Sequence, residues 1–303
     1  MKQGSPKILV VFPIILTIAT AIIMGLILLI SNIFAVSGMF LVLAITLGAL
    51  VSVALNLIIL TMIDPILAES IKKNHRLIRF ESLSHPLMLR MSYEAPGTFH
   101  HVINVSILAQ KAAKAIGADA LLTRVASYYH DLGKLDAPTL YIENQSGEEI
   151  PKTYDSENIA SQAQKIISHV KNGVQIASEN HLPIEIIEMI KEHHGTTSVL
   201  FFYEMAKERK LKVKRTDLKY EGPTPTTRES AILMLADSVE AATRSVPFLT
   251  QELFREIVEN TFSDKIREKQ LKNSGMSEHD IKTVKDSLLE TLDSIYHQRI
   301  LRS

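Results

Sequence analysis

The segment that decides the fold closes a helix with the sequence YYHDLGK at residues 128–134. A second segment, with the sequence KEHHG at residues 191–195, also has two potential metal ligands followed by a glycine. In each, two side chains that can bind a metal stand in the last helical turn before a glycine. The unpaired carbonyls of a helix C-terminus favour a nearby cation. Adjacent helical residues diverge by about 100°, so each pair suits two neighbouring ions better than one closed site.

The chain around these segments is predicted to be helical from residue 81 onward. Apolar residues recur at spacings of three and four, over residues 102–115, 120–129, 159–177, 184–190, 231–239, 253–262 and 281–300. No long alternating pattern favours strands, so the predicted fold class is all-α. Gly117, Gly133 and Gly195 are predicted to end helices. Thr226 and Glu229 have the spacing of a capping box and predict a helix start there.

Two polar stretches without helical periodicity cover residues 136–154 and 212–227. Long irregular insertions in a compact helical domain are often lids or binding loops. A flexible surface loop explains each stretch equally well. The sequence leaves both interpretations open.

The N-terminal 63 residues differ sharply in composition from the rest. They contain no acid, and their only charges are Lys2 and Lys7. Residues 8–30 and 39–63 carry no charge, and each run exceeds the roughly 20 apolar residues that span a bilayer. A cleaved signal peptide would have an apolar core of only about 7–15 residues. We therefore expect a membrane hairpin over residues 1–63.

The flanking charges predict the orientation of this hairpin. Lysines precede the first span, and Lys72, Lys73, Arg76 and Arg79 follow the second, whereas the connection at residues 31–38 is uncharged. By the positive-inside rule both termini and the remainder of the chain are cytoplasmic, at the cell (inner) membrane. Residues 64–82 are predicted to form a connecting helix, and residues 83–303 the cytoplasmic domain. Asp64-Pro65 has the pattern of a cap followed by a first-turn proline, and a kink within a longer helix explains Pro65 as well.

Small residues recur at every fourth position in both predicted spans. Such stripes allow close helix packing, either within the hairpin or between copies of the chain in a homo-oligomer. They are Thr17, Ala21 and Gly25 in the first span, and Ala44, Gly48, Ser52 and Asn56 in the second.

Composition limits the chemistry of the chain. It contains no cysteine, which excludes disulfides, thiolate metal sites and cysteine nucleophiles. Lys and Arg together equal Asp and Glu at 33 each, which argues against binding a nucleic-acid polymer through bulk positive charge. Any metal site must use nitrogen and oxygen ligands.

Histidines and aspartates are placed unusually in the predicted helices. His100-His101, His130-Asp131, His169 and His193-His194 lie within helices or at their ends, mostly beside apolar residues. Asp237 interrupts the run ILMLAD at residues 232–237. A carboxylate among such neighbours is costly unless it is paired or binds a cation. Together these residues predict a buried metal site.

Six motifs follow one another in the second part of the chain: PGTFHH at 96–101, HDLGK at 130–134, IENQ at 142–145, ISHV at 167–170, HHGTT at 193–197 and LADSVEA at 235–241. In this order they resemble the HD-domain phosphohydrolases, and more narrowly the cytoplasmic domain of the seven-transmembrane receptor HD family, the PgpH-type cyclic di-AMP phosphodiesterases. The resemblance covers residues 83–300 and implies an HD-domain helical bundle behind the two-helix transmembrane hairpin.

The resemblance implies seven metal ligands in this chain. They are His101, His130, Asp131, His169, His193, His194 and Asp237. His100 matches no ligand and is interpreted as a supporting or structural residue. If Asp131 bridges, His101, His130 and Asp237 complete one site, and the other three histidines complete a second. The family implies two divalent ions, iron or manganese.

This arrangement implies a phosphodiesterase that converts cyclic di-AMP to linear pApA. Two ions about 3.5–4 Å apart turn a bridging water into a hydroxide nucleophile and neutralise phosphoryl oxygens. Asp131 and Lys134 are the candidate catalytic residues. Lys134 and, more weakly, Arg244 are candidate substrate contacts, although a solvated lysine at a helix end explains Lys134 as well.

Two alternatives and one departure remain. A related subfamily that hydrolyses cyclic di-GMP carries a Gly-Tyr-Pro signature, which is absent here; a phosphohydrolase of another nucleotide is therefore disfavoured but open. A non-catalytic HD receptor module is the other alternative.

The relatives have an extracellular domain and seven membrane spans, whereas this sequence contains two predicted spans. This is either a natural short form or a piece that holds the last spans.

Overall fold

The computed structural model describes residues 38–145, 159–208, 210, 214–246 and 250–300, together with residues 22, 25 and 26. The chain divides into two compact units, Met1–His75 and Arg76–Ser303. Within the described residues there is no β-strand, only an isolated bridge between Ser198 and Lys219. The predicted all-α class is confirmed.

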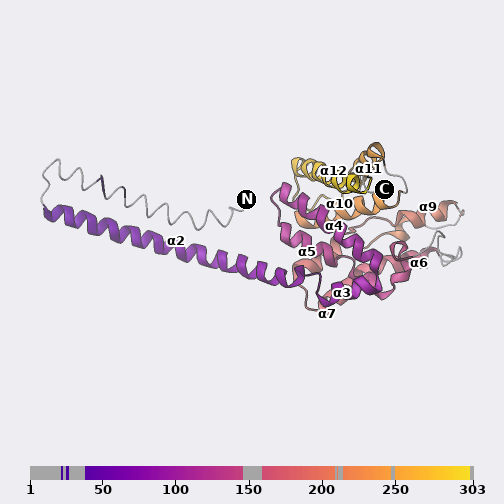
Figure 1. Ribbon diagram of the computed structural model, residues 1–303, viewed down its shortest axis with the longest axis horizontal. Helices are drawn as coiled ribbons and strands as arrows, with labels where there is room; N and C mark the ends of the chain where they lie inside the picture. The colour runs from indigo at the N-terminus through magenta and orange to yellow at the C-terminus, as the bar shows by residue number, and fades with distance from the viewer. Residues whose placement is uncertain are drawn as a thin grey trace. The chain divides into compact units, whose positions relative to one another are not determined.

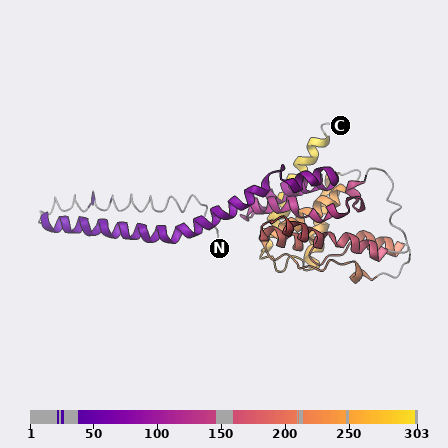
Figure 2. The ribbon, with the colours of Figure 1, turned by 90° about the horizontal axis from the view of Figure 1, so that it is seen from below.

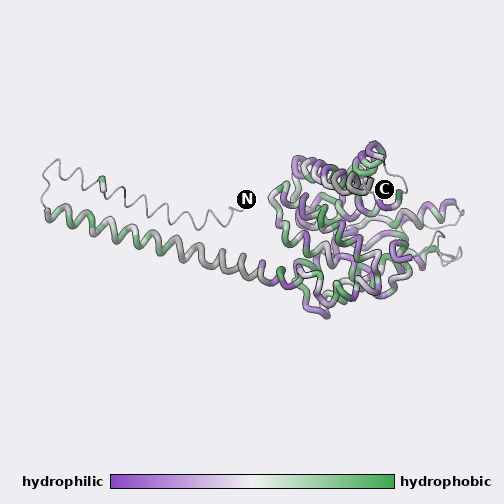
Figure 3. The backbone as a smooth tube through the Cα atoms, in the orientation of Figure 1, coloured by the Kyte–Doolittle hydropathy of each residue, from purple (hydrophilic) through white to green (hydrophobic). Residues whose placement is uncertain are grey.

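The first unit contributes most of helix α2, Gly38–Glu81, drawn as one unbroken helix in Figure 1 and Figure 2. Residues Gly38–Leu55 have a mean hydropathy of 2.4 and are long and apolar enough to cross a membrane. Large apolar side chains such as Leu43, Leu47 and Leu50 are exposed along it, and Figure 3 shows this stretch mainly in the hydrophobic colour. A lipid environment would remove that exposed apolar surface from water.

Only one candidate span is thus found among the described residues, and the two-helix hairpin is not confirmed. The first predicted span, residues 8–30, lies almost wholly outside the described residues. The helix also does not restart at Asp64-Pro65, because both residues lie inside α2. The helix start at that point was wrong, and Pro65 is instead accommodated inside a longer helix, as the other interpretation allowed.

The second unit is a bundle of helices around α4 (Figure 1). Its elements are α3 Pro86–Glu94, α4 Pro96–Ala115, α5 Ala120–Tyr129, the short 3-10 helices η1 Leu132–Asp136, η2 Pro138–Leu140 and η3 Ile142–Asn144, then α6 Ile159–Ile167, α7 His169–Glu179, α8 Ile184–Glu192, α9 Leu200–Glu208, η5 Arg215–Leu218, α10 Arg228–Arg244, α11 Gln251–Arg267 and α12 Glu278–Ile300. Helix α4 packs against α3, α5, α10 and α12.

Apolar faces of these helices form one main core. Val105 and Leu108 of α4, Ile190 of α8, and Leu233 and Leu235 of α10 are fully buried in it. A smaller cluster joins α6, α9 and η5 through apolar side chains such as Phe202 and Leu218. Fully burying one such side chain stabilises the fold by about 1.5–3 kcal/mol, so the main core fixes α4, α5, α8 and α10 relative to one another.

Local capping explains several helix starts. Asp119 accepts a hydrogen bond from the Leu122 backbone N–H at the start of α5, as a good N-cap residue should. At α10 the cap is Thr227, which accepts from the Ser230 N–H at 3.1 Å. The predicted Thr226–Glu229 capping box is therefore wrong. Thr226 instead donates its hydroxyl to Glu192, and Glu229 accepts from the Asp119 N–H.

The predicted single helix over residues 159–177 is divided into α6 and α7 at Ser168. At the break the carbonyl oxygen of Ile166 lies 2.6 Å from Nδ1 of His169. Gly117 and Gly195 end helices with positive φ, as predicted. Gly133 does not, because it lies within η1 against the backbone of α7.

Candidate metal centre

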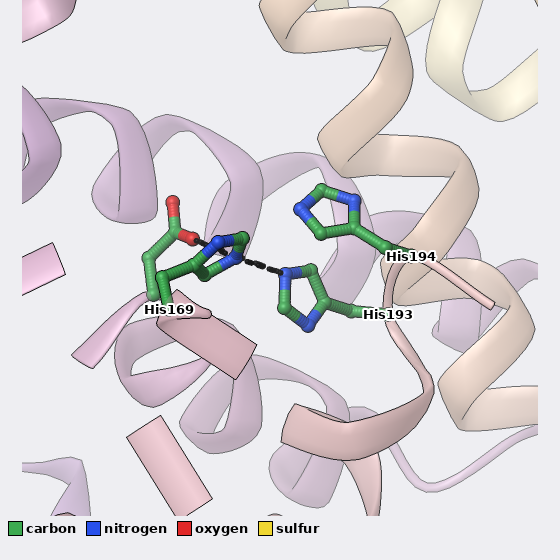
Figure 4. A group of neighbouring side chains, drawn as sticks. His169, His193 and His194 are labelled. Carbon is green, nitrogen blue, oxygen red and sulfur yellow. Dashed lines mark hydrogen bonds and ion pairs between the residues drawn. The ribbon is translucent and has the colours of Figure 1, made fainter. Parts of the chain in front are cut away.

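The structure brings all seven sequence-predicted ligands together in the second unit. They come from α4 (His101), the turn between α5 and η1 (His130, Asp131), the start of α7 (His169), the residues after α8 (His193, His194) and α10 (Asp237). Two groups form, and the candidate ligand atoms within each lie within 4.8 Å of one another: Asp131 with His169, His193 and His194, and His101 with His130 and Asp237. Figure 4 shows the three histidines of the first group pointing toward one another.

Asp131 lies between these two groups. Its Oδ2 is 3.4 Å from Nε2 of His101 and 3.3 Å from Nε2 of His130. Its Oδ1 is 3.4 Å from Nε2 of His169 and 3.9 Å from Nε2 of His193. Each carboxylate oxygen therefore faces one group, which is the arrangement that a bridging ligand requires.

Asp237 also faces both groups, which the sequence did not predict. Its Oδ1 lies 3.1 Å from Nε2 of His101 and 3.7 Å from Nε2 of His130. Its Oδ2 lies 3.7 Å from Nδ1 of His194. The Asp237 carboxylate thus has one oxygen facing each group.

Hydrogen bonds behind the histidines fix which ring nitrogen faces the site. Nδ1 of His130, His169 and His193 each lies 2.6–2.8 Å from a backbone carbonyl three residues earlier. A carbonyl only accepts, so Nδ1 carries the proton and Nε2 of the neutral ring presents a lone pair. The geometry thus prepares three Nε2 atoms as ligands.

Without a cation these lone pairs have no suitable partner. Nε2 of His169 and Nε2 of His193 face each other at 3.3 Å, although both rings already commit their proton at Nδ1. Within the described residues, Nε2 of His130 and Oδ1 of Asp131 are buried without a well-aligned hydrogen-bond partner. Buried polar atoms are rarely left in this state. The donor set of imidazoles and carboxylates therefore fits divalent metal ions.

The electrostatics of the centre are strongly perturbed. Burial lowers the pKa of His130, but the Asp131 and Asp237 carboxylates together outweigh this effect and raise the pKa to about 10. Burial opposes ionisation of Asp131 too, yet the Lys134 ammonium and His130 hold its pKa well below the usual range. Burial, reinforced by His130, lowers the pKa of His193 to about 3. In the metal-free chain Asp131 therefore stays ionised at neutral pH, and Nε2 of His130 carries a second proton beside it, which a bound cation would replace.

These shifts predict how the metal-free chain responds to pH. The pKa of His193 is lower in the folded than in the unfolded chain. Its contribution to the free energy of unfolding is therefore present above about pH 6.5 and is lost as the pH falls. His130 has a raised folded pKa, so its contribution is present below about pH 6.5 and is lost as the pH rises toward 10. We expect thermal unfolding of metal-free protein to show maximal stability near pH 6.5. At pH 5 the His193 contribution falls by about 2 kcal/mol; a flat profile from pH 5 to 8 would contradict the prediction.

The other sequence-predicted residues lie around the centre. Lys134 is nearly buried, with Nζ 2.8 Å from Oδ2 of Asp131 and 2.7 Å from Oε1 of Glu143. Arg244 is partly exposed, and its Nη1 lies 3.5 Å from Oε2 of Glu240. His100 is exposed and lies outside both ligand groups.

Sequence reasoning missed three residues beside the ligands. Glu240 lies behind His101, at 2.5 Å from its Nδ1. Glu143 holds Lys134, and Tyr220 stacks on His194 with ring centroids 4.2 Å apart. Glu240 could have been noticed from its place one turn after Asp237 in the same motif. Tyr220 belongs to an irregular stretch and had no local signal.

A cavity of about 340 Å³ opens beside His194. The ring of Tyr220, the apolar side chains of Ile167 and Val174, and the lysines Lys171 and Lys191 are part of its wall. Ligand pockets commonly combine such apolar walls with a few polar groups. The cavity therefore continues the candidate site away from the seven ligands.

Comparison with known proteins gives a consistent result. Residues 98–242 match the family model of the HD domain. The chain is 40% identical over 225 residues to the cyclic-di-AMP phosphodiesterase PgpH of Listeria monocytogenes, covering 74% of this chain and 31% of that protein. It is 36% identical to the PgpH of Bacillus subtilis with the same coverage. The chain thus spans about a third of the length of these curated relatives.

Solved structures extend the comparison to the fold. The crystal structure of the L. monocytogenes PgpH HD domain has a TM-score of 0.67 and 40% identity, covering 71% of this chain and 100% of that one. The same domain in complex with cyclic-di-AMP has a TM-score of 0.65, covering 70% and 98%. The chain therefore belongs to the HD-domain family and, within it, to the PgpH-type proteins.

Proposed function

We propose that this chain is a membrane-anchored, metal-dependent phosphodiesterase that hydrolyses cyclic di-AMP to linear pApA. The observation that carries the proposal is Asp131, whose two oxygens face two groups of imidazoles inside one buried centre. The PgpH relatives named as cyclic-di-AMP phosphodiesterases and the PgpH HD domain solved with that nucleotide supply the substrate class.

Membership of the HD-domain family and the two His/Asp groups indicate divalent metal binding. We propose two ions: one held by His101, His130, Asp131 and Asp237, and the other by Asp131, His169, His193 and His194. Such a pair lowers the pKa of a shared water and neutralises phosphoryl oxygens. Imidazoles with carboxylates suit iron, manganese, zinc or cobalt, and the family resemblance favours iron or manganese among them.

Lys134 has two proposed roles at this site. Its contacts with Asp131 and Glu143 hold the Asp131 carboxylate in place. An ammonium group has three N–H donors, so Lys134 can also offer one to a phosphate oxygen of the substrate. Arg244 is the secondary candidate, because its guanidinium is partly exposed beside Glu240. The cavity beside His194 has room for a nucleoside outside the reacting phosphodiester.

The membrane arrangement is also a proposal. The apolar half of α2 is one candidate span, and residues 8–30 are the proposed second. From their flanking lysines and arginines we propose, by the positive-inside rule, that both termini and residues 83–303 are cytoplasmic, with residues 64–82 as the connection. Self-association through the small-residue stripes is proposed on the same sequence grounds.

The decisive experiment compares substrates on the full chain in detergent. After loading with Mn²⁺ or Fe²⁺, we expect cyclic di-AMP to be hydrolysed faster than cyclic di-GMP, with pApA as the product. Elemental analysis should find close to two ions per chain. Preference for cyclic di-GMP would overturn the substrate assignment. Retention of two ions without hydrolysis of either nucleotide would favour a non-catalytic receptor module.

A further inference from the structure

Glu240 is a buried carboxylate directly behind one of the candidate ligands. It lies on α10, one helical turn after Asp237, and its side chain is 5% exposed. Its Oε2 is 2.5 Å from Nδ1 of His101, and its Oε1 accepts a hydrogen bond from Nδ2 of Asn104 at 3.2 Å. Both oxygens are therefore engaged on α4, and the carboxylate fixes the orientation of the His101 ring.

This support differs from that of the other histidines. Nδ1 of His130, His169 and His193 lies against a backbone carbonyl of its own segment. Among the described candidate ligands, only His101 has a carboxylate within hydrogen-bonding distance of Nδ1, because Nδ1 of His194 lies 3.7 Å from Asp237, which is itself a candidate ligand. A carboxylate partner is negatively charged and makes a stronger hydrogen bond than a neutral carbonyl. It also raises the electron-donating power of the opposite ring nitrogen, here Nε2.

The charge distribution follows the same asymmetry. The group of His101, His130 and Asp237 has the Glu240 carboxylate immediately behind it. Behind the rings of His169 and His193 stand the neutral backbone carbonyls of Ile166 and Ile190. Arg244 lies 3.5 Å from Glu240 but is 36% exposed, so solvent screens its compensating charge. Glu240 thus adds negative potential at the His101 group that the His169 group lacks, although the Lys134 ammonium, 2.8 Å from Oδ2 of Asp131, offsets part of it.

We infer that Glu240 is a positioning residue that makes the His101 group the tighter of the two metal positions. The inference rests on the proposed two-metal site and adds an order to it: the ion at His101, His130 and Asp237 binds first and leaves last. A carboxylate behind a ligating histidine typically changes metal affinity by about 10–100-fold. The two ions should therefore be released separately rather than together.

The test uses Glu240→Gln in the full chain. Glutamine keeps an acceptor for Nδ1 of His101 but removes the negative charge. Protein loaded with Mn²⁺ is dialysed against increasing EDTA, and the ions retained per chain are counted by elemental analysis. We expect the wild type to lose its two ions at two different EDTA concentrations. In the variant the second, tighter release should shift to about 10–100-fold weaker binding, while the first is unchanged.

Glu192→Gln is the matched control. Glu192 is equally buried, precedes His193 directly, and accepts hydrogen bonds from the N–H and hydroxyl of Thr226. Its substitution removes a buried charge beside the centre without removing the partner of an imidazole. We expect both release steps of this control to match those of the wild type. Thermal unfolding of the metal-free proteins verifies that each variant is folded.

The outcomes separate this inference from the proposed function. Wild-type protein that binds no metal contradicts the two-metal site itself. The role of Glu240 is overturned if Glu240→Gln releases both ions at the same EDTA concentrations as the wild type. It is also overturned if only the release of the weaker ion shifts. If Glu240→Gln fails to fold, Asn104→Ala decides, because it releases Oε1 of Glu240 and keeps the charge. In Asn104→Ala, weaker binding of the tighter ion, by less than in Glu240→Gln, supports the inference. Unchanged binding of that ion overturns it.

Discussion

Asp131→Asn is expected to remove activity and metal together. We predict a fall in kcat/KM for cyclic di-AMP of at least about 10³-fold, equivalent to about 4 kcal/mol of transition-state stabilisation. We also predict retention of less than one ion per chain. The reason is that one carboxylate faces both imidazole groups, with Oδ2 toward His101 and Oδ1 toward His169. An amide is neutral and presents only one oxygen, so it cannot serve both groups.

The measurement pairs steady-state hydrolysis with elemental analysis of the same preparation. Asp286→Asn is the control, because Asp286 is exposed on α12 outside both ligand groups, and its substitution removes the same charge. Its activity and metal content should equal those of the wild type. An Asp131→Asn protein that keeps two ions and loses less than tenfold in kcat/KM would show that Asp131 is not the bridging ligand.

The candidate ligands could be predicted from the sequence because each has a strong local pattern. His130-Asp131 and His193-His194 precede glycines at helix ends, and Asp237 interrupts an apolar run. The all-α class followed from periodicity in the same way. Their grouping around Asp131 depended on the family resemblance, since distances between separate helices have no local signal. The structure shows that grouping but also places Asp237 between both groups.

Features that depend on contacts between distant segments were not predicted. The capping box at Thr226 had the right spacing, but Glu192 from α8 takes the Thr226 hydroxyl and Thr227 becomes the cap. Glu240 belongs to the motif at residues 235–241, yet no feature of the neighbouring sequence indicates that its carboxylate reaches His101 on α4. Helix starts and supporting side chains are set by such tertiary partners, which override local propensity.

Gly133 illustrates the same limit and gives the second large prediction. The sequence suggested a helix end, whereas the structure shows close contact between η1 and α7. A Cβ atom at Gly133 would lie 1.8 Å from the carbonyl oxygen of His169 and 2.5 Å from the N–H nitrogen of Gly173. Both are backbone atoms, so no side chain can move aside. Alanine there must push α7 away from the turn that carries His130 and Asp131.

We therefore expect Gly133→Ala to cost about 3 kcal/mol or more in the free energy of unfolding, at the upper end of overpacking effects. For a domain of this size that lowers the Tm by about 10 °C. The variant should also lose metal, because His169 begins the displaced helix. Differential scanning calorimetry and elemental analysis measure the two effects on the same samples.

Two further glycines calibrate that result. Gly117→Ala meets open space but has a φ of +66°, so only backbone strain of about 1 kcal/mol is expected. Gly173→Ala faces its nearest neighbour at 3.1 Å, a contact that small shifts relieve, and helix propensity offsets about 1 kcal/mol of the cost. Both controls should keep two ions. The contrary outcome is that Gly133→Ala unfolds at the same temperature as Gly117→Ala or higher and retains its metal. The ligands would then tolerate the displacement that the clash requires, and close packing of η1 on α7 would not be what holds His169 in the centre.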